Sequence, residues 1–484
     1  MIITQERSSS CDEKDVVKSG LACGGGHHSA GQSSKQGPRI ALLTPYNGGN
    51  LGDAAIQDAL IANIRLRLPD AQFSGISLNC DEFVERHGGG AFPIRGTLLL
   101  HGWADGRAAN QARGGETVAG ASCQEKQRAV GIKSALKAVP LLGRCLKTIH
   151  TWGREVRHCS RAYAFLRTQD LLIVSGGGQL CDRWGGPWHH PFALFKWALL
   201  AQIAQIPYVV ASVGATNDAS MTSRLFMSAA LRMARYRSFR DKDSREIASG
   251  FTRLAARDSI VPDIAFSLPT SELPQPAGVR ELAQGRTIVA ISPIAYAKPG
   301  RWPREDRALH NRYVQQMASV VSQLLERDYF LVMVWSSLAD DESVIPEILA
   351  LLDQRSKQKL TRQMHIATIS SWKDLVASLM DVDFLIASRL HSAILGFVSR
   401  KPTIAISFDP KVDWMMGDLG QADYLLQIGD FEADDVIESL NRLKLRKDGV
   451  IEQIGSYQRR ILSTLAVQYD ALAQLAAINY QRRN

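Results

Sequence analysis

Two side chains of complementary chemistry, Arg389 and His391, lie on a short segment between a predicted strand and a predicted helix. Phe384–Ala387 is an apolar run of strand length, and the apolar residues that follow Ser392 are typical of a helix. In open α/β sheets such turns lie beyond the carboxyl ends of the strands, where a helix N-terminus favours a bound anion. A permanent cation beside an imidazole therefore predicts a site that holds an anion and moves a proton. The alternative is that Arg389 pairs with a nearby carboxylate and that His391 caps the helix.

Three more charged residues follow other predicted strands. Arg240 ends one strand with Asp241 beside it, and Lys411 follows a later apolar strand. Asp53 begins a helix after the glycine-rich turn 45–52 and could face a cleft. Each has a structural alternative. Arg240 and Asp241 could form a surface ion pair of little consequence, and Asp53 could only stabilise the first turn of its helix.

Glycines at predicted strand ends mark places where a ligand can approach the backbone closely. Three consecutive glycines follow the apolar run 170–175, and Asp182 comes after them among aromatic and polar residues that suit the faces and edges of a sugar ring. In the earlier glycine-rich turn, 45–53, the spacing matches neither a dinucleotide fingerprint nor a P-loop. The residues expected to contact a sugar are Asn50, Gly177, Gly178 and Asp182.

Strands and helices alternate in both halves of the chain. A proline-rich link, 271–284, separates a first half, 39–270, from a second half, 285–484. This pattern predicts an α/β protein with two Rossmann-like domains that face each other across a cleft. The last predicted helix, near 451–480, is long enough to cross back to the first domain.

Length and composition limit the class of protein. The 484 residues exceed what one core usually supports, and the apolar fraction of 45% is that of a soluble globular protein. The net charge of +9 predicts an anionic substrate, a membrane surface or nucleic acid as partner. Nucleic acid fits worst, because the basic residues lack interleaved stacking aromatics and a recognisable binding module. The seven scattered cysteines fit reduced thiols and a cytoplasmic location.

Two segments fall outside the predicted core. The tail, 1–38, is rich in Ser, Gly and Lys, so we expect it to be disordered and to be neither a signal peptide nor a membrane anchor. Within the insertion 101–167, the basic part 126–167 has interleaved apolar residues. It is either an amphipathic helix held against anionic headgroups at the inner face of the membrane or a solvated basic helix. Cys23 with two nearby histidines fits a glycine-flanked tail better than a metal site, and we predict no bound metal.

Six short motifs resemble those of the polysaccharide pyruvyl transferases, a family whose fold resembles that of the two-Rossmann (GT-B-like) glycosyltransferases. They occur in the right order over about 39–430. The long basic insertion and the stretch 181–190 depart from the family pattern. These departures affect which acceptor the resemblance implies, and not which donor. The motifs are Gly49-Asn50-Leu51-Gly52-Asp53, Ser175-Gly176-Gly177-Gly178, Arg240-Asp241 with Ser244, Pro262-Asp263, Ser388-Arg389-Leu390-His391-Ser392 and Asp409-Pro410-Lys411-Val412.

The resemblance implies transfer of the enolpyruvyl carbon skeleton of phosphoenolpyruvate onto two hydroxyls of a sugar. The product is a ketal, phosphate is released, and no cofactor is expected. The acceptor would be a sugar of an exopolysaccharide or cell-surface glycan, or its lipid-linked precursor.

The donor and the reaction then suggest a role for each candidate residue. Phosphoenolpyruvate carries two anionic groups, so its site needs at least two cations. His391 is the candidate proton shuttle, although as an imidazolium it could instead only hold phosphate. Asp53, expected on the facing domain, would orient or deprotonate the acceptor. The residues expected to bind phosphoenolpyruvate are Arg240, Arg389, Lys411 and Ser392.

Two other classes of function are compatible with the sequence. A nucleotide-sugar-dependent glycosyltransferase shares the architecture and would also place basic residues near a diphosphate. A non-catalytic carbohydrate- or membrane-binding protein would tolerate the loss of Arg389 and His391 together.

Overall fold

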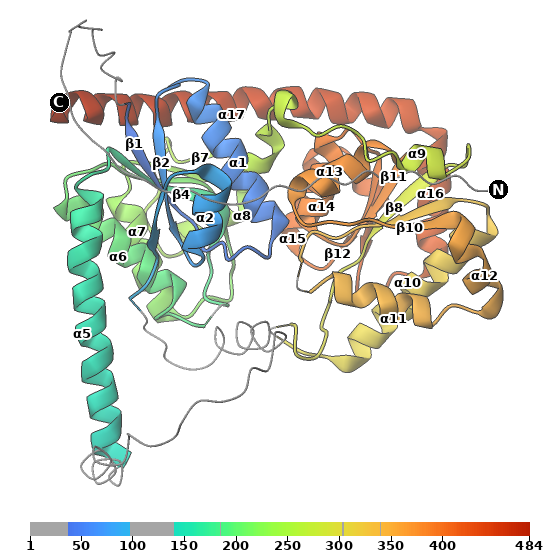
Figure 1. Ribbon diagram of the computed structural model, residues 1–484, viewed down its shortest axis with the longest axis horizontal. Helices are drawn as coiled ribbons and strands as arrows, with labels where there is room; N and C mark the ends of the chain where they lie inside the picture. Colours follow the sequence, from blue (N-terminus) through green and yellow to red (C-terminus); the bar gives the residue numbers. More distant parts are fainter. Residues whose placement is uncertain (1–36, 97–139, 184, 303, 339) are drawn as a thin grey trace, which may run out of the picture. The chain divides into compact units, whose positions relative to one another are not determined.

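The computed structural model describes residues 37–96, 140–183, 185–302, 304–338 and 340–484, and of 140–152 only the course of a helix. Residues 37–484 form one compact unit. It contains two parallel sheets, each with helices between its strands, as in Rossmann-like domains (Figure 1). The predicted α/β class with two Rossmann-like domains is confirmed. Most of the predicted tail, with its Cys23 group, and residues 101–139 of the insertion lie outside the described residues.

The first sheet has seven parallel strands in the order β3-β2-β1-β4-β5-β6-β7, so the direction of winding reverses between β1 and β4. Its central strands are nearly continuous apolar runs because helices cover both faces of the sheet. The strands are β1 (Arg39–Leu43), β2 (Gln72–Ser77), β3 (Gly90–Pro93), β4 (Leu171–Leu180), β5 (Tyr208–Ala215), β6 (Tyr236–Phe239) and β7 (Ser259–Ile260).

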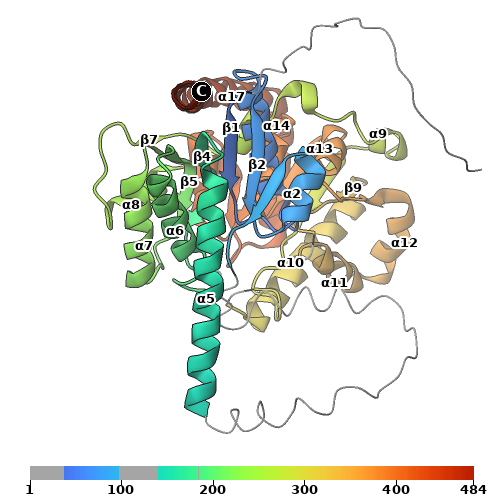
Figure 2. The same ribbon diagram turned by 60° about the vertical axis from the view of Figure 1, so that its left-hand side comes forward.

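Alternate residues of these strands enter two separate cores. Leu42 and Ile173 face α1 and η2, whereas Leu43 and Val174 face the side covered by α5, α6 and α7. Both views show α5, α6 and α7 side by side (Figures 1 and 2). The helices of this half are α1 (Leu51–Arg65), α2 (Cys80–His87), α5 (Pro140–Leu166), α6 (His190–Ile203), α7 (Met221–Met233), α8 (Lys242–Ser249), η2 (Ile264–Ser267) and η3 (Thr270–Glu272).

The second sheet repeats the first with six strands in the order β10-β9-β8-β11-β12-β13, and its winding reverses between β8 and β11. The strands are β8 (Ile288–Ser292), β9 (Phe330–Met333), β10 (Met364–Ile366), β11 (Phe384–Ala387), β12 (Thr403–Ser407) and β13 (Leu425–Gln427). The helices are α9 (Val279–Leu282), α10 (Arg307–Glu326), η4 (Glu342–Val344), α11 (Ile345–Ala350), α12 (Gln354–Gln363), α13 (Trp372–Met380), α14 (Leu390–Val398), α15 (Pro410–Asp418), η5 (Ala422–Tyr424) and α16 (Ala433–Leu445).

The last helix, α17 (Lys447–Arg483), contacts both halves of the chain. Near its start Gln458 donates to the Phe397 carbonyl at 2.5 Å, and near its end Asn479 donates to the Asp170 carbonyl at 3.0 Å. Among the described helices α17 alone is long and apolar enough to cross a bilayer by length and composition. Its buried side chains recur along one face and pack on β1, β4, α1 and η2 of the first half and on α16 of the second.

Two segments differ from what the sequence predicts. The glycine-rich stretch 88–90 shows no strand pattern in the sequence, but Gly90 begins β3, which pairs in parallel with β2. The end of the predicted insertion is a regular crossover helix: α5 leads from β3 to β4 and buries Ala162 and Leu166 in the core. The pattern missed β3 because this edge strand is short and half-exposed and therefore lacks an apolar alternation.

Candidate functional site

The predicted site residues follow the carboxyl ends of strands from both sheets. Asn50 and Asp53 come after β1, Arg240 directly after β6, His391 after β11 and Lys411 after β12. In doubly wound sheets this edge is where ligands bind, next to the point at which the winding reverses. The fold therefore explains why residues so distant in sequence can contribute to one site.

Backbone hydrogen bonds join the loops of the two sheets at this edge. Leu51 N donates to the Ser336 carbonyl at 2.9 Å, and Leu338 N donates to the Gly49 carbonyl at 2.9 Å. Asn50 and Ser337 form an isolated antiparallel bridge between them. The turn after β1 is thus fixed to the loop after β9, and the start of α1 is positioned by the second half of the chain.

The N-terminus of α1 lies against the imidazole of His391. A Cβ atom added to Gly52 would lie 1.9 Å from Cγ of His391, so only glycine leaves room for the ring. Asn50 caps the helix by accepting from Gly52 N at 3.0 Å, and its amide donates to Asp53 Oδ2 at 3.0 Å. The two predicted catalytic residues, Asp53 and His391, therefore lie at the same helix end.

Asp263, at the start of η2, lies between two of the predicted functional groups. Its Oδ2 is 3.5 Å from Arg240 Nη1 and 3.7 Å from His391 Nε2, while Oδ1 accepts from Ala265 N at 3.0 Å. Burial would raise the pKa of the Asp263 carboxyl, but the neighbouring His391 and Arg240 outweigh it and lower that pKa to about 2. Asp263 is therefore an ionised, buried partner for one imidazole and one guanidinium.

His391 keeps one polar atom unused. Its side chain is 14% exposed. Its Nε2 is buried and lies 3.7 Å from its ion-pair partner, Asp263 Oδ2, but makes no hydrogen bond within the described residues. A buried polar atom without a partner is costly unless a ligand or a water satisfies it. This atom therefore has the capacity for one hydrogen bond to a ligand or a water.

Asp53 lies in the same electrostatic environment. Burial raises the pKa of its carboxyl, and the nearby charge of Asp263 adds to this, whereas His391, Arg240 and Lys411 act in the opposite direction. Its Oδ1 faces the glycine-rich strand end, because a Cβ on Gly177 would lie 3.4 Å from it. Asp53 is thus both the first-turn carboxylate that the sequence allows and a group inside the charged cluster.

Lys411 forms an ion pair at the start of α15. Its Nζ lies 2.8 Å from Asp409 Oδ2, and the side chain remains 33% exposed. Asp409 also caps α15, accepting from the backbone N–H of Lys411 at 3.3 Å. Burial would raise the pKa of the Asp409 carboxyl, but Lys411 and then Arg240 lower it, so both cations border this carboxylate.

Arg389 has a carboxylate of its own. Its Nε and Nη2 donate to Asp341 Oδ2 and Oδ1 at 2.8 and 2.7 Å, a bidentate pair in which Asp341 is fully buried. The structure therefore contains the carboxylate partner that the sequence left as an alternative. Among the described residues Nη1 of Arg389 makes no further hydrogen bond, so this nitrogen remains for a ligand.

Aromatic rings connect Arg389 with Lys411. The guanidinium carbon of Arg389 lies 5.9 Å from the ring centre of Trp302, whose ring is 5.2 Å from that of Phe408. Nζ of Lys411 lies 6.0 Å from the same Phe408 ring. Arg389 and Lys411 thus border one aromatic surface, while Arg240 belongs to the group around Asp263.

The hydroxyl of Ser392 is buried among other side chains and is not exposed to a ligand. It is fully buried, and its Oγ lies 2.7 Å from Ser292 Oγ and 3.0 Å from Ser336 Oγ. These contacts link the ends of β8 and β9 to α14. Its predicted contact with phosphoenolpyruvate stays a prediction, and in the folded chain it positions the segment that carries Arg389 and His391.

The residues predicted to contact the acceptor lie around the end of β4. Gly177 has a φ of 71°, which favours glycine, and Gly178 is exposed with open space where a Cβ would be. Asp182 holds the start of α7, because its Oδ2 accepts from Ser220 N at 2.9 Å and Ser223 Oγ at 2.6 Å. The glycines leave room for a ligand, whereas the role of Asp182 in acceptor binding stays a prediction.

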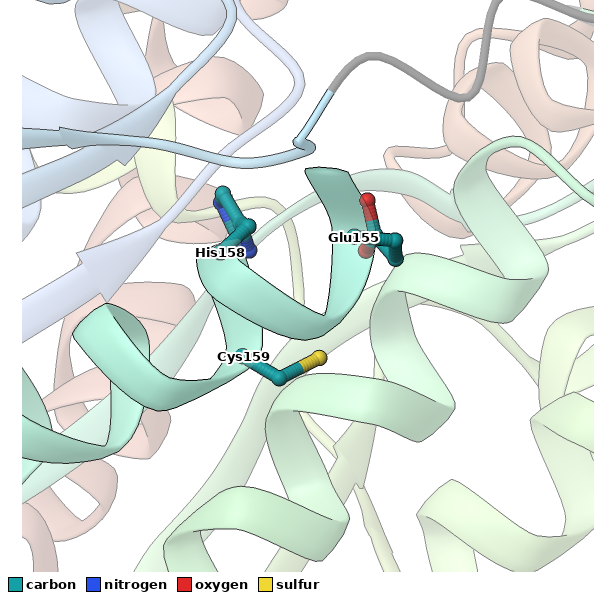
Figure 3. Close-up of side chains that lie close together, drawn as sticks. All are labelled: Glu155, His158 and Cys159. Carbon is teal, nitrogen blue, oxygen red and sulfur yellow. The ribbon is translucent and has the colours of Figure 1, made fainter. Parts of the chain in front are cut away.

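One group of side chains has the composition of a metal site. Glu155, His158 and Cys159 lie close together on α5 (Figure 3). Lys196 of α6 extends into the group, with Nζ 2.6 Å from Glu155 Oε1 and 3.4 Å from His158 Nδ1. An ammonium therefore occupies the place that a cation would take, and the cluster fixes α5 against α6.

Asp263 and Asp341 are the functional residues for which the sequence assigned no role. Asp263 belongs to one of the six motifs, but the motif alone indicates no chemistry for it, and Asp341 belongs to none of them. No sequence signal identifies these two carboxylates, because each pairs with a cation that is distant in sequence and close only in the folded chain.

The comparison with protein families gives one result. The sequence profile described as polysaccharide pyruvyl transferase matches residues 50–410, which is more than half of the 484 residues. The chain belongs to the polysaccharide pyruvyl transferase family. The matched range begins at the turn after β1 and ends at the start of α15, so it includes Asp53, Arg240, Asp263, Arg389 and His391 and stops one residue before Lys411.

Solved structures with a similar fold are enzymes of nucleotide-sugar chemistry and related proteins. A putative UDP-N-acetylglucosamine 2-epimerase from Listeria monocytogenes is 11% identical, with a TM-score of 0.50, covering 90% of this chain and 97% of its own. The HepE protein of Anabaena, solved with UDP, is 10% identical, with a TM-score of 0.50, covering 92% and 100%. At this identity the likeness shows the GT-B-type fold alone. The comparison with curated proteins finds no match.

Proposed function

We propose that this member of the family transfers pyruvate from phosphoenolpyruvate to a sugar of a surface polysaccharide, or of its lipid-linked precursor, as a ketal. The observation that supports it best is the buried Nε2 of His391, which makes no hydrogen bond within the described residues and lies 3.7 Å from its ion-pair partner Asp263 Oδ2, beside Arg240. A proton donor next to permanent cations suits a substrate that must be protonated while its anionic groups are held.

The donor is held by its two anionic groups. Nη1 of Arg389 and the half-exposed ammonium of Lys411 border one aromatic surface and are the groups that would bind phosphate or carboxylate. Arg240 contributes positive charge near His391, although Asp263 and Asp241 already neutralise part of it. The binding energy then comes from cations that are held in position by ion pairs with neighbouring carboxylates.

The reaction requires a proton at carbon 3 and two attacks at carbon 2. His391 protonates carbon 3, and the first sugar hydroxyl adds to carbon 2 with loss of its proton to Asp53. The C–O bond to phosphate then breaks, and phosphate leaves with the electron pair. The second hydroxyl attacks the resulting oxocarbenium ion and loses its proton, which closes the ketal. The two sugar hydroxyls lose two protons in all. One makes up for the proton that His391 gave to carbon 3, and the other leaves with the released phosphate.

Nucleotide-sugar transfer is the second candidate, because the fold is shared with proteins solved with UDP. Thermal-shift measurements separate the two. We expect phosphoenolpyruvate to raise the melting temperature of the wild-type protein and to have little effect on His391→Ala combined with Lys411→Ala. UDP and UDP-sugars are expected to have no effect. Stabilisation by UDP-sugars without a response to phosphoenolpyruvate would reject the proposed donor.

A further inference from the structure

Away from the site, helices α5, α6 and α7 present exposed apolar side chains on one side of the first sheet. The helices lie side by side in both views (Figures 1 and 2). Met221, Leu225 and Val156 are 83%, 67% and 66% exposed, and the others are 41% to 56% exposed. We call this set the α5–α7 face: Val156, Trp188, Leu199, Ile203, Met221 and Leu225.

The apolar residues of α6 and α7 form a continuous strip. Residues 188, 192, 195, 199 and 203 follow the helical spacing of an outer stripe, whereas Trp197 and Leu194 point into the core. Phe226 of α7 joins the stripe, with its ring centre 5.3 Å from that of Trp188 and 5.5 Å from that of Phe195. The strip is therefore ordered by its own aromatic contacts and not composed of isolated side chains.

The charge on these helices is of one sign. The sequences of α5, α6 and α7 contain one acidic residue, Glu155, which is buried and paired with Lys196 at 2.6 Å. Arg154, Arg157 and Arg161 are exposed along one line of α5. A second copy of the chain would bring these arginines towards each other, whereas an anionic bilayer offers both negative charge and an apolar interior.

The orientation of the helices also fits a surface. In a parallel α/β unit the helices begin at the carboxyl edge of the sheet, and α6 begins shortly after the glycine-rich end of β4. This edge carries Asp53 and Arg240, and His391 of the second half lies against it at Gly52. A bilayer against the α5–α7 face would therefore lie beside the site, at the end from which a lipid-linked sugar could enter.

From these observations we propose that the α5–α7 face docks on a bilayer of anionic phospholipids, with its apolar strip at the acyl boundary and its arginines at the headgroups. Docking does not depend on the reaction at the site, since it is measured without substrate.

The test is co-sedimentation of the full chain with vesicles. We expect binding to vesicles of equal parts phosphatidylcholine and phosphatidylglycerol, weakening with added salt, and little binding to phosphatidylcholine alone. Leu225→Glu should lower the partition coefficient at least about tenfold. Val467→Glu is the matched control, because Val467 is 70% exposed on α17, outside the α5–α7 face, and should leave binding unchanged.

A second variant tests the charge. Arg157→Gln with Arg161→Gln should weaken binding by roughly 25-fold, because each basic side chain near an anionic surface contributes about fivefold. Arg355→Gln with Arg362→Gln, on the exposed part of α12, is its control. Equal binding to both kinds of vesicle would overturn the proposal, as would equal effects of Leu225→Glu and Val467→Glu. So would a solution dimer that Leu225→Glu dissociates in a protein that does not bind vesicles, since a second copy would then be the occupant.

Discussion

Individual carboxylates keep the basic residues of the site in place. Asp263 lies within 3.7 Å of both His391 and Arg240, and fully buried Asp341 forms a bidentate pair with Arg389. A buried cation without a partner is costly, so each carboxylate stabilises the charge that the substrate must meet. The cost of this arrangement is that part of each guanidinium is already used, which leaves Nη1 of Arg389 and Nε2 of His391 for the ligand.

The contact between Gly52 and His391 gives a direct test at this scale. In Gly52→Ala the new Cβ would lie 1.9 Å from His391 Cγ, so the imidazole must move away from Asp263. We expect transfer to fall by about 100-fold or more, because a displacement of about 1 Å at a catalytic group has that effect. Phosphate release measured with donor and acceptor checks it.

Gly449→Ala is the control for this substitution, because Gly449 is also in the first turn of a helix and has open space around it. It should retain full activity and melt at the wild-type temperature or slightly above. Wild-type rates for Gly52→Ala would show that the position of the imidazole is unimportant.

The carboxyl of Asp53 predicts a dependence on pH. Burial raises its pKa above the usual value for aspartate, so the fraction ionised grows over a higher pH range than for an exposed aspartate. If Asp53 accepts the proton of the acceptor hydroxyl, kcat rises with pH through this range. Asp53→Asn should lower kcat by about 100-fold or more, and its residual rate should lack this rise. A pH profile of Asp53→Asn with the same acid limb would assign the limb to another group.

At the scale of elements, the site is formed by the turns that follow parallel strands. The first sheet is in turn stabilised by contacts with α17. Ser212 in β5 has a φ of 51°, unusual for a residue other than glycine. Its N–H donates to Ser238 Oγ at 2.7 Å, and Gln468 of α17 donates to Ser212 Oγ at 3.0 Å. The strand distortion next to the site is therefore held by a side chain from the far end of the chain.

Gln468→Leu should reveal this connection. Gln468 is 1% exposed, and its loss leaves the buried hydroxyl of Ser212 without a partner and that of Ser238 without an acceptor, although Ser238 Oγ still accepts from Ser212 N. We expect the free energy of unfolding to fall by about 2 to 4 kcal/mol, since each unsatisfied buried group costs about 1 to 3 kcal/mol. Denaturant unfolding provides the measurement. Val467→Ala, one residue away and exposed, should change it by less than about 0.5 kcal/mol, and an equally small effect of Gln468→Leu would show that α17 does not support β5.

How far the sequence predicts these elements depends on the length and burial of each. Central strands such as β4, β5 and β12 are apolar runs closed by glycine or polar turns, and their positions follow from that pattern. Because parallel strands end at one edge, Asp53, Arg240, His391 and Lys411 could be assigned to one site. The partners Asp263 and Asp341 could not be predicted, because their pairing depends on how loops from different strands meet in three dimensions.

In the whole molecule, two Rossmann-like sheets are joined by backbone hydrogen bonds between their loops, Leu51 with Ser336 and Leu338 with Gly49. Asp53 is supplied by the first half and His391 by the second, and the glycine at position 52 lets them lie together. In the proposed reaction Arg389, His391 and Lys411 of the second half hold the donor together with Arg240 of the first half, while the acceptor approaches the glycine-rich end of β4.

The most direct measurement is the mass of the product formed from phosphoenolpyruvate and sugar acceptors, including lipid-linked oligosaccharides. The account predicts that one acceptor gains a single carboxyethylidene group while one phosphate is released, and that His391→Ala abolishes both. An acceptor that instead gains a sugar from a nucleotide-sugar donor, with phosphoenolpyruvate left unchanged, would contradict it.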